Sequence, residues 1–199
     1  MVSEAQNPDI ASVVSSGGVI AFRTDTFYGL GADPLNAAAV KRVWELKGRE
    51  EGKPILLLIS DPQEVTRFVS SPTQIFSELA NRFWPGPLTL IGVAQARLPP
   101  ELTAGTGTIG LRLPNDKRVR DLVRICGGAL TATSANPSQK PPARTASEVR
   151  NYFGDKLDFI IDDGEVKVSA PSTVVDATGT VARIVREGLI TQEQMGIGL

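Results

Sequence analysis

The sequence predicts an α/β protein of one domain, residues 1–199, built on a mixed β-sheet. Short apolar runs of strand length alternate along the chain with longer amphipathic segments that carry helix caps. Some neighbouring strand-like runs have only loops between them, so antiparallel pairs are expected beside parallel ones. No internal repeat, low-complexity tract or linker-like change in composition divides the chain.

Capping residues predict the helices and their order. Each expected helix opens on a side chain whose oxygen can accept from the free N–H groups of the first turn, and several end at glycine. The expected openings are Asn7-Pro8 for a helix that stops at 15–18, Asn36 for 37–47, a capping box at 61–64, Ser71-Pro72 for a helix that ends near Trp84, Asn115 or Asp116 for 117–128, and Thr145 with Glu148 at N3 for the next helix.

Apolar runs bounded by turn residues predict the strands. The runs GVIAF and PILLLI are apolar throughout, which is typical of strands that are buried on both faces. The segment RTDTFYGLG at 23–31 is expected to be a loop, because glycine and hydroxyl side chains dominate it. The expected strands are 18–22, 54–59, 88–94, 108–114, 129–134, 158–162, 172–177 and 181–187.

Composition excludes several kinds of chemistry. The chain has no histidine and one cysteine, which rules out Ser-His-Asp and Cys-His nucleophiles, imidazole-ligated metals and an internal disulfide framework. With 21 basic and 22 acidic residues the formal charge is −1, which argues against a dedicated nucleic-acid or membrane-surface binder. The N-terminus has no signal-peptide pattern, and the longest apolar run, 55–59, is far too short to cross a bilayer, so a cytoplasmic location is expected.

Three local patterns do not predict the sites they resemble. The G-x-G-x-x-G of residues 105–110 leads into a strand and opens no helix, so a dinucleotide site is not expected there. Cys126 follows apolar Ile125 at the end of a helix and is expected to be a buried core thiol. The DDGE stretch at 162–165 could hold Mg²⁺, but it is more typical of a solvated turn.

Polar and cationic residues gather in segments that follow the expected strands. The hydroxyl-rich segments 23–31 and 131–146 stand where an open α/β sheet places its ligand crevice. Taken singly, each such segment is also explained as a polar loop or as surface charge. Four cations in this set suit a polyphosphate, whose oxygens accept charge-assisted hydrogen bonds. They are Lys47, Arg49, Lys53 and Arg186.

Arg112 is a further anomaly, because it stands inside the apolar run IGLRLP. A guanidinium in a buried strand needs an anionic partner, and its planar fork suits a carboxylate. The partner can be a structural salt bridge or a bound ligand, and the residue types leave both open.

An ordered set of motifs carries a family resemblance. TDTFYGLG, the K-x-R of 47–49, the KP of 53–54, WPGPLT, IGLRLP, TSAN, PSTVVD and a closing R-x-G resemble the YrdC family in order and spacing, from about residue 10 to 190. The resemblance implies a twisted mixed sheet flanked by helices around a large, concave, electropositive cleft, in the short form with a single YrdC-like domain. Members of this family are threonylcarbamoyl-AMP synthases. They join L-threonine, bicarbonate or CO2, and ATP, and release pyrophosphate, for N6-threonylcarbamoyladenosine (t6A) in tRNA.

Carried over residue by residue, the resemblance implies a catalytic pair and two subsites. The catalytic pair is Lys47 and Arg49. The threonine subsite comprises Thr26, Arg112 and Ser172, with Arg112 on the carboxylate. Mg²⁺ is implied only as the companion of ATP, without a dedicated protein site. The ATP subsite comprises Arg49, Lys53, Thr108, Ser134, Asn136, Pro142 and Arg186.

Three residues depart from the family pattern. Arg23 stands where proline is usual, Leu58 where many members carry a histidine near threonine, and Gln139 where glycine is common. None of them removes the K-x-R or S-A-N residues, so activity is expected to survive. The resemblance also implies downstream threonylcarbamoyl-transfer proteins as partners, and it leaves direct contact with tRNA open.

Two other functions stay open at this point. A double-stranded RNA-binding or ribosome-maturation module could use the same cleft by recognising shape and phosphates, although the net charge weakens this alternative. A carbamoyl-adenylate module of the hydrogenase-maturation type would bring acylphosphatase and zinc-finger segments, and the sequence shows neither. The cations that could supplement an RNA surface are Lys117, Arg118, Arg120 and Arg124.

Overall fold

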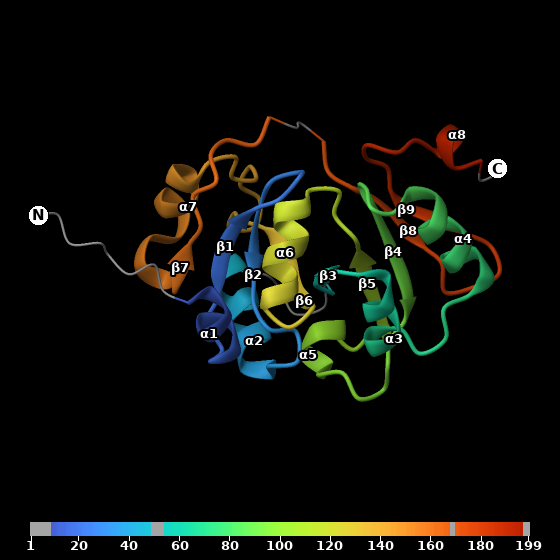
Figure 1. Cartoon of the computed structure of the whole chain (residues 1–199), viewed down its shortest axis with the longest axis horizontal. Helices are drawn as coiled ribbons and strands as arrows, with labels where there is room; N and C mark the ends of the chain where they lie inside the picture. The colour runs from blue at the N-terminus through green and yellow to red at the C-terminus, as the bar shows by residue number, and fades with distance from the viewer. Residues whose placement is uncertain (1–8, 49–53, 168–169, 197–199) are drawn as a thin grey trace, which may run out of the picture.

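One mixed β-sheet runs through the computed structural model, which describes residues 9–48, 54–167 and 170–196. Its strands in the described residues are β1 (Ile20–Arg23), β2 (Tyr28–Gly31), β3 (Leu56–Ile59), β4 (Leu88–Val93), β5 (Thr108–Arg112), β6 (Ala129–Ser134), β7 (Phe159–Ile160), β8 (Thr173–Asp176) and β9 (Arg183–Arg186). The order across the sheet is β7-β1-β2-β6-β3-β5-β4-β8-β9 (Figure 1). The β1–β7, β3–β5 and β4–β8 pairs are parallel and the other pairs are antiparallel, which confirms the predicted mixed sheet.

Helices flank this sheet, and four of the six predicted caps open a described helix. Asn36 accepts from the backbone N–H of Ala39 at 3.1 Å, and Asp116 and Thr145 cap their helices in the same way. None of the described helices has both the length and the apolar character needed to cross a bilayer. The helices are α1 (Ile10–Ser15), α2 (Ala37–Lys47), η1 (Pro62–Glu64), α3 (Val65–Phe68), α4 (Gln74–Phe83), α5 (Pro100–Thr103), α6 (Lys117–Ile125), α7 (Ala146–Phe153), η2 (Gly154–Lys156) and α8 (Gln192–Met195).

Two predicted helix openings are wrong by two residues. α1 is capped by Asp9, whose carboxylate accepts two bonds from the first turn, and the predicted cap Asn7 lies outside the described residues. α4 is capped by Thr73 and not by Ser71. The Thr73 hydroxyl accepts from the third residue of the helix at 3.1 Å and donates to the carbonyl of Ala177 at 2.8 Å. That second bond crosses between distant segments, so a local sequence pattern does not contain it.

The predicted loop at 23–31 is wrong in its second half, because Tyr28–Gly31 forms β2 between β1 and β6. Its glycines conceal the strand in the sequence, yet packing requires one of them. A Cβ on Gly31 would lie 2.6 Å from a ring carbon of Phe22. The sequence patterns also missed α5 and α8, because a single turn of helix is too short to show a period.

The two faces of the sheet are covered unequally. Side chains alternate along each strand, so Leu57 and Leu58 of β3 belong to different hydrophobic clusters. The larger cluster packs the sheet against α2, α4 and α7. The smaller cluster includes Leu58, Ala132 and Val123 and lies under α1 and α6, and Figure 1 shows α6 in front of the sheet. This second face is only partly covered, and a cavity opens beside the smaller cluster.

Candidate active site

A cavity of about 360 Å³, named here the central cavity, opens on the sheet face that carries the smaller cluster. Its volume lies in the range of small-molecule sites. The apolar floor comes from β3 and β6 and consists of Leu56, Leu58 and Ala132. Hydroxyl and guanidinium groups form much of the wall. The polar wall residues are Thr24, Thr26, Thr133, Ser134, Ser172, Arg112 and Arg186.

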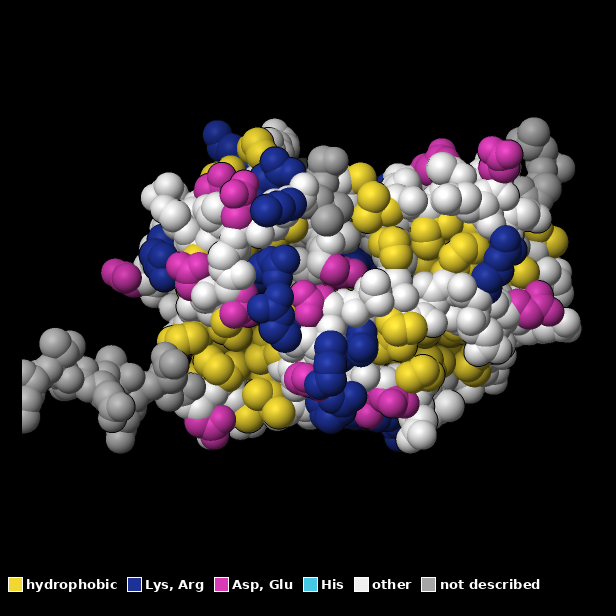
Figure 2. Space-filling view, turned by 45° about the horizontal axis from the view of Figure 1, so that its top comes forward, with side chains coloured by type: hydrophobic (Ala, Val, Ile, Leu, Met, Phe, Trp, Pro, Cys, Tyr) yellow, Lys and Arg dark blue, Asp and Glu magenta, His cyan; other side chains and the backbone are white. Residues whose placement is uncertain are grey.

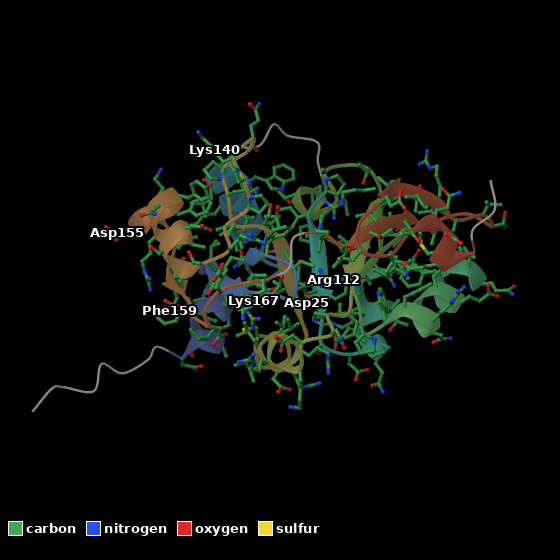
Figure 3. All side chains as sticks on the ribbon, turned by 90° about the horizontal axis from the view of Figure 1, so that it is seen from above. Asp25, Arg112, Lys140, Asp155, Phe159 and Lys167 are labelled. Atoms are coloured by element: carbon green, nitrogen blue, oxygen red, sulfur yellow. The ribbon has the colours of Figure 1, made fainter. Side chains whose placement is uncertain are left out.

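Arg112, the last residue of β5, is 4% exposed and is held by three acceptors. Its Nε donates to the carbonyl of Gly86 at 3.1 Å and its Nη1 to the hydroxyl of Thr26 at 3.3 Å. Its Nη2 forms an ion pair with the carboxylate of Asp25, and Figure 3 shows these two side chains side by side. A guanidinium has five N–H donors. These contacts leave one N–H on each terminal nitrogen for a ligand.

Thr26 is positioned by a tight turn between β1 and β2. The hydroxyl of Thr24 donates to the carbonyl of Phe27 at 2.6 Å and accepts from the backbone N–H of Thr26 at 3.1 Å. The hydroxyls of Thr24 and Thr26 also lie 3.1 Å apart. The turn therefore fixes the Thr26 hydroxyl at the cavity wall, in contact with Arg112.

Ser172 and Arg186 form another part of the wall of the central cavity. The buried Ser172 hydroxyl lies 3.0 Å from that of Thr89. Arg186 reaches from β9, and its Nη2 donates to the carbonyl of Ser172 at 2.9 Å and to its hydroxyl at 3.3 Å. Burial, followed by the charge of Arg112, lowers the pKa of Arg186 below its usual value. Two guanidiniums thus face one cavity, which favours an anionic ligand.

Lys47 comes from α2, which packs on the sheet face that carries the larger cluster. It is the last residue of α2, which ends because Gly48 adopts the left-handed conformation with φ 55°. The buried ammonium donates to the carbonyl of Ser134 at 2.6 Å and to the side-chain oxygen of Asn136 at 3.0 Å. Lys47 is not among the lining residues of the central cavity, but its ammonium contacts Ser134, which is one of them.

Asn136 links this lysine to the loop that follows β6. Its amide nitrogen donates to the carbonyls of Pro137 at 3.0 Å and Lys140 at 2.5 Å, while its oxygen accepts from Lys47. The amide therefore has partners within the protein at both ends. Its implied contact with the nucleotide stays a prediction.

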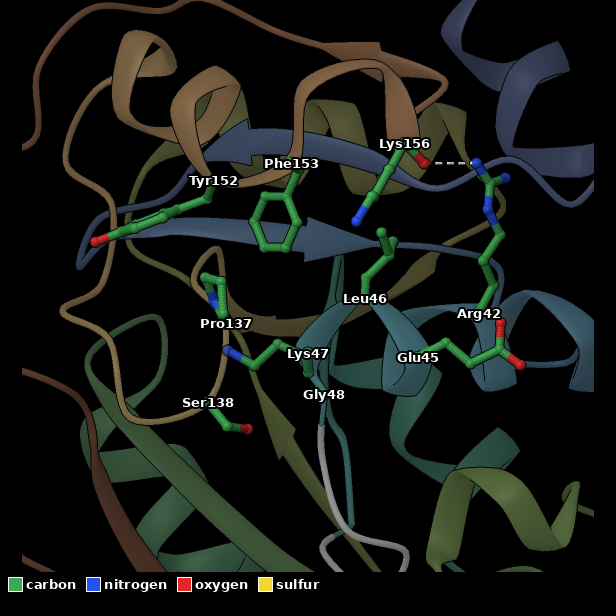
Figure 4. Close-up of a pocket in the computed structure, with 10 residues that line it drawn as sticks. All are labelled: Arg42, Glu45, Leu46, Lys47, Gly48, Pro137, Ser138, Tyr152, Phe153 and Lys156. Carbon is green, nitrogen blue, oxygen red and sulfur yellow. Dashed lines mark hydrogen bonds between the residues drawn. The ribbon is translucent and has the colours of Figure 1, made fainter.

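A second cavity of about 680 Å³, named here the rear cavity, lies behind Lys47. Figure 4 shows Lys47 between Pro137 and Ser138, with Tyr152 and Phe153 of α7 beyond them. The backbone N–H of Ser138 donates to the carbonyl of Lys47 at 2.8 Å. The stem of Lys47 and this loop therefore separate the two cavities.

Most of the site residues expected from the sequence converge. Thr26, Arg112, Ser134, Pro142, Ser172 and Arg186 line the central cavity. Thr108 does not line it. It stands at the opposite end of β5 from Arg112, and its hydroxyl lies 3.0 Å from that of Thr106. A strand of this length separates its ends by roughly 13 Å. The implied contact of Thr108 with the nucleotide stays a prediction. Arg49 and Lys53 lie outside the described residues.

The three departures from the family pattern also have defined places. Arg23 forms an ion pair with Asp116 at 3.6 Å. Leu58 lies in the cavity floor, and Gln139 adopts φ 67°, a left-handed conformation that glycine adopts at less cost.

Three sequence patterns were not expected to form a site, and none of them lines the central cavity. Gly105 and Gly107 precede β5 and adopt positive φ, and Gly110 lies within β5. Cys126 is only half-buried, and desolvation raises its pKa to about 11. Asp162 accepts from the backbone N–H of Gly164 at 3.3 Å, as in a turn. Among the described residues, no three His, Cys, Asp or Glu side chains gather as metal ligands.

Asp25 is the functional residue that the sequence interpretation missed. The segment 23–31 drew attention through its hydroxyls, and the carboxylate among them was not assigned. The available signal was Arg112, because a guanidinium in a buried strand requires an anion. The structure supplies it from Asp25, which also accepts from the backbone N–H of Asn115 at 3.4 Å.

Comparison with known proteins places this arrangement in a family. The model of the Sua5/YciO/YrdC family, described as telomere recombination, matches residues 12–188. A protein of Thiobacillus denitrificans named threonylcarbamoyl-AMP synthase is 40% identical over 182 residues, 90% of this chain and 96% of the relative.

Two solved structures are also similar. Pyrococcus abyssi Sua5 complexed with L-threonine has a TM-score of 0.89 at 34% identity, over 93% of this chain and 54% of that one. Escherichia coli YciO has a TM-score of 0.80 at 26% identity, over 90% of this chain and 87% of that one. The similarity therefore covers both the sheet and the residues around its cavity. On the family match and the identity to its relatives, this chain belongs to the Sua5/YciO/YrdC family.

Proposed function

We propose that this chain is a threonylcarbamoyl-AMP synthase. It forms L-threonylcarbamoyladenylate and pyrophosphate from L-threonine, bicarbonate or CO2, and ATP, for t6A in tRNA. One observation carries the proposal. Two guanidiniums face one cavity of small-molecule size, and a buried lysine contacts Ser134 of its wall. Such an array suits a ligand pair that brings a carboxylate and phosphates together. The names of the relatives support the same activity.

On the amino-acid side, Arg112 offers one N–H on each terminal nitrogen to the threonine carboxylate. The hydroxyls of Thr26 and Ser172, which line the same cavity, supply neutral partners. The threonine nitrogen attacks CO2, a carbon–nitrogen bond forms, and the nitrogen loses a proton. The resulting carbamate needs no nucleophile from the protein, which agrees with a chain that has no histidine.

On the nucleotide side, the carbamate oxygen attacks the α-phosphorus, the bond to the bridging oxygen breaks, and pyrophosphate leaves. This step needs positioning and charge neutralisation above all. Lys47 and Arg186 supply charge, and Ser134 and Pro142 complete the wall. The described wall offers no carboxylate to a metal, so Mg²⁺ would be held by the ATP phosphates and would help to neutralise their charge.

The RNA-binding alternative gains little from the surface. Figure 2 shows Lys and Arg side chains in a line across one face, with acidic side chains among them. On α6, Lys117 and Arg124 both pair with Asp121, and Arg118 pairs with Asp116. Arg120 donates to backbone carbonyls. Cations engaged in this way contribute less to a polyanion interface. Contact with tRNA, downstream transfer proteins and a cytoplasmic location remain predictions.

The test is pyrophosphate release in degassed buffer with ATP, bicarbonate and L-threonine, each omitted in turn, with the adenylate identified by mass spectrometry. Release is expected only when all three are present. Release that ignores threonine overturns the proposal. Salt-sensitive binding of duplex RNA without turnover would instead support the alternative.

A pair of arginine variants tests the site itself. Arg112→Ala is expected to raise the KM for threonine by about 10- to 100-fold, and the KM for ATP far less, because a charged hydrogen-bond donor is lost. Arg183→Ala is the matched control, since Arg183 lies on β9 but is exposed and pairs with Asp176. Equal changes in both KM values would contradict the assignment of Arg112.

A further inference from the structure

We propose that Asp25 is a positioning residue for the amino-acid substrate. Its carboxylate holds the Arg112 guanidinium in the one orientation that presents a donor on each terminal nitrogen to the central cavity. The inference rests on the proposed function and adds a residue to it. Asp25 touches no substrate and acts only through Arg112.

The contacts fix the guanidinium on three sides. The carbonyl of Gly86 holds Nε, the hydroxyl of Thr26 holds Nη1, and Asp25 holds Nη2. The first two partners are neutral, and Asp25 is the carboxylate with which Arg112 pairs among the described residues. A side chain with this many rotatable bonds loses much entropy when it is fixed, so a strong partner at the far nitrogen matters most for its orientation.

Asp25 is itself held in place. Its second oxygen accepts from the backbone N–H of Asn115 at 3.4 Å, at the turn before α6. Its side chain is 17% exposed, against 4% for that of Arg112. The ion pair therefore joins the turn between β1 and β2 to the end of β5. It is anchored to backbone at both ends.

Charge gives the pair a second role. Arg186 faces the same cavity, and the charge of Arg112 helps to lower the pKa of Arg186. Two guanidiniums near each other repel, and without a nearby carboxylate each would be pushed to turn towards solvent. Asp25 offsets this repulsion from behind Arg112, while the cavity side stays cationic.

The same ion pair could in principle oppose binding, if Asp25 occupied the place of the substrate carboxylate. The geometry disfavours this. Thr24 and Thr26 line the central cavity, whereas Asp25 between them does not. The carboxylate thus approaches Arg112 from outside the cavity. Removal of Asp25 should therefore weaken threonine binding and not tighten it.

The experiment compares Asp25→Ala, Asp25→Asn and Asp25→Glu by steady-state kinetics and by calorimetric binding of L-threonine. The matched control is Asp158→Ala, because Asp158 likewise accepts from an arginine, Arg42 at 2.5 Å, and from a backbone N–H, that of Val19 at 2.7 Å. We expect Asp25→Ala to raise the threonine KM and Kd by about 10- to 100-fold. The KM for ATP should change less than about threefold, because the nucleotide is held by other groups.

The conservative variants separate positioning from folding. Asp25→Asn keeps the shape and should fall between wild type and Asp25→Ala, while Asp25→Glu should restore most of the threonine affinity. Asp158→Ala should leave the threonine KM unchanged. An unchanged or lower threonine KM in Asp25→Ala and Asp25→Asn overturns the inference, as does an equal rise in the ATP KM. Wild-type protein that neither binds threonine nor needs it for turnover overturns the proposed function, a distinct result.

Discussion

Leu57 and Leu58 are consecutive residues of β3 and are equally buried, yet they face opposite sides of the sheet. The Leu57 side is closed by α2, α4 and α7 and contains the larger hydrophobic cluster. The Leu58 side is closed by α1 and α6 over a smaller cluster, and beside that cluster lies the central cavity. One face thus supplies most of the packing, and the other combines packing with a ligand site.

The two faces together show how the fold places charged side chains beside an apolar sheet. Arg112 and Ser134 stand at strand ends on the cavity face, where the smaller cluster no longer covers the sheet. Lys47 comes instead from α2 on the packed face, and its ammonium contacts Ser134 of the cavity wall at the end of β6. The site is therefore assembled from both layers, and variants on the two faces should separate stability from turnover.

The largest effect is expected at Lys47. Lys47→Met keeps an unbranched side chain, shorter by one atom, but removes the charge, so kcat should fall by about 10²- to 10³-fold, as when one electrostatic donor is removed from other active sites. Stability should fall by only about 1–3 kcal/mol, because Ser134 and Asn136 lose a hydrogen-bond partner. Initial rates of pyrophosphate release and urea unfolding measure the two quantities.

The matched control is Lys41→Met, since Lys41 lies on the exposed side of the same helix. It should retain wild-type kcat. A Lys47→Met enzyme with turnover within about threefold of wild type would contradict the role of the packed face in the site.

The second-largest effect is expected at Leu57 and Leu58, where alanine variants compare the two faces directly. Leu57→Ala should lower the free energy of unfolding by about 3–4 kcal/mol and leave the threonine KM unchanged, because it opens a void inside the larger core. Leu58→Ala should cost about 2 kcal/mol, since part of its surface already borders a cavity, and should alter the threonine KM. Urea unfolding at constant m-value and steady-state kinetics test this. Equal stability losses with no change in KM would remove the distinction between the faces.

Sequence patterns predicted much of the fold because each pattern reflects a requirement of the local backbone conformation. Asn36 and Gly48 predict both ends of α2, since an N-cap oxygen and a left-handed glycine act within one turn. β2 was missed because glycine is unusual in a strand, and Gly31 is required there by its packing against Phe22, a contact between strands. The Thr73 cap was missed for a similar reason, because its hydroxyl also bonds to a distant carbonyl.

The site shows the same limit. The hydroxyls and cations predicted a phosphate-binding pocket and left a carboxylate ligand for Arg112 open, and six of the site residues implied by the family resemblance line the central cavity. The pairing of Asp25 with Arg112 joins positions 87 apart in sequence, and no local pattern connects them. Thr108 stands at the far end of β5 from Arg112 and does not line the central cavity, so its assignment to the nucleotide stays a prediction from the family resemblance.

The smallest effect is expected at Cys126, which packs against the smaller cluster from the end of α6. Desolvation raises the pKa of this thiol to about 11 in the folded chain, so the folded state keeps its proton over a range in which the unfolded state has lost it. Stability should therefore fall as pH rises from about 9 to 11. A shift of two pKa units corresponds to about 2.7 kcal/mol, and solvent screening of a half-exposed group reduces this to about 1 kcal/mol. Urea unfolding of wild type and Cys126→Ala at pH 7 to 11 should show the steeper alkaline loss in wild type. Tyrosines titrate in both proteins and cancel in the difference, so parallel curves would show that the smaller cluster does not shield the thiol.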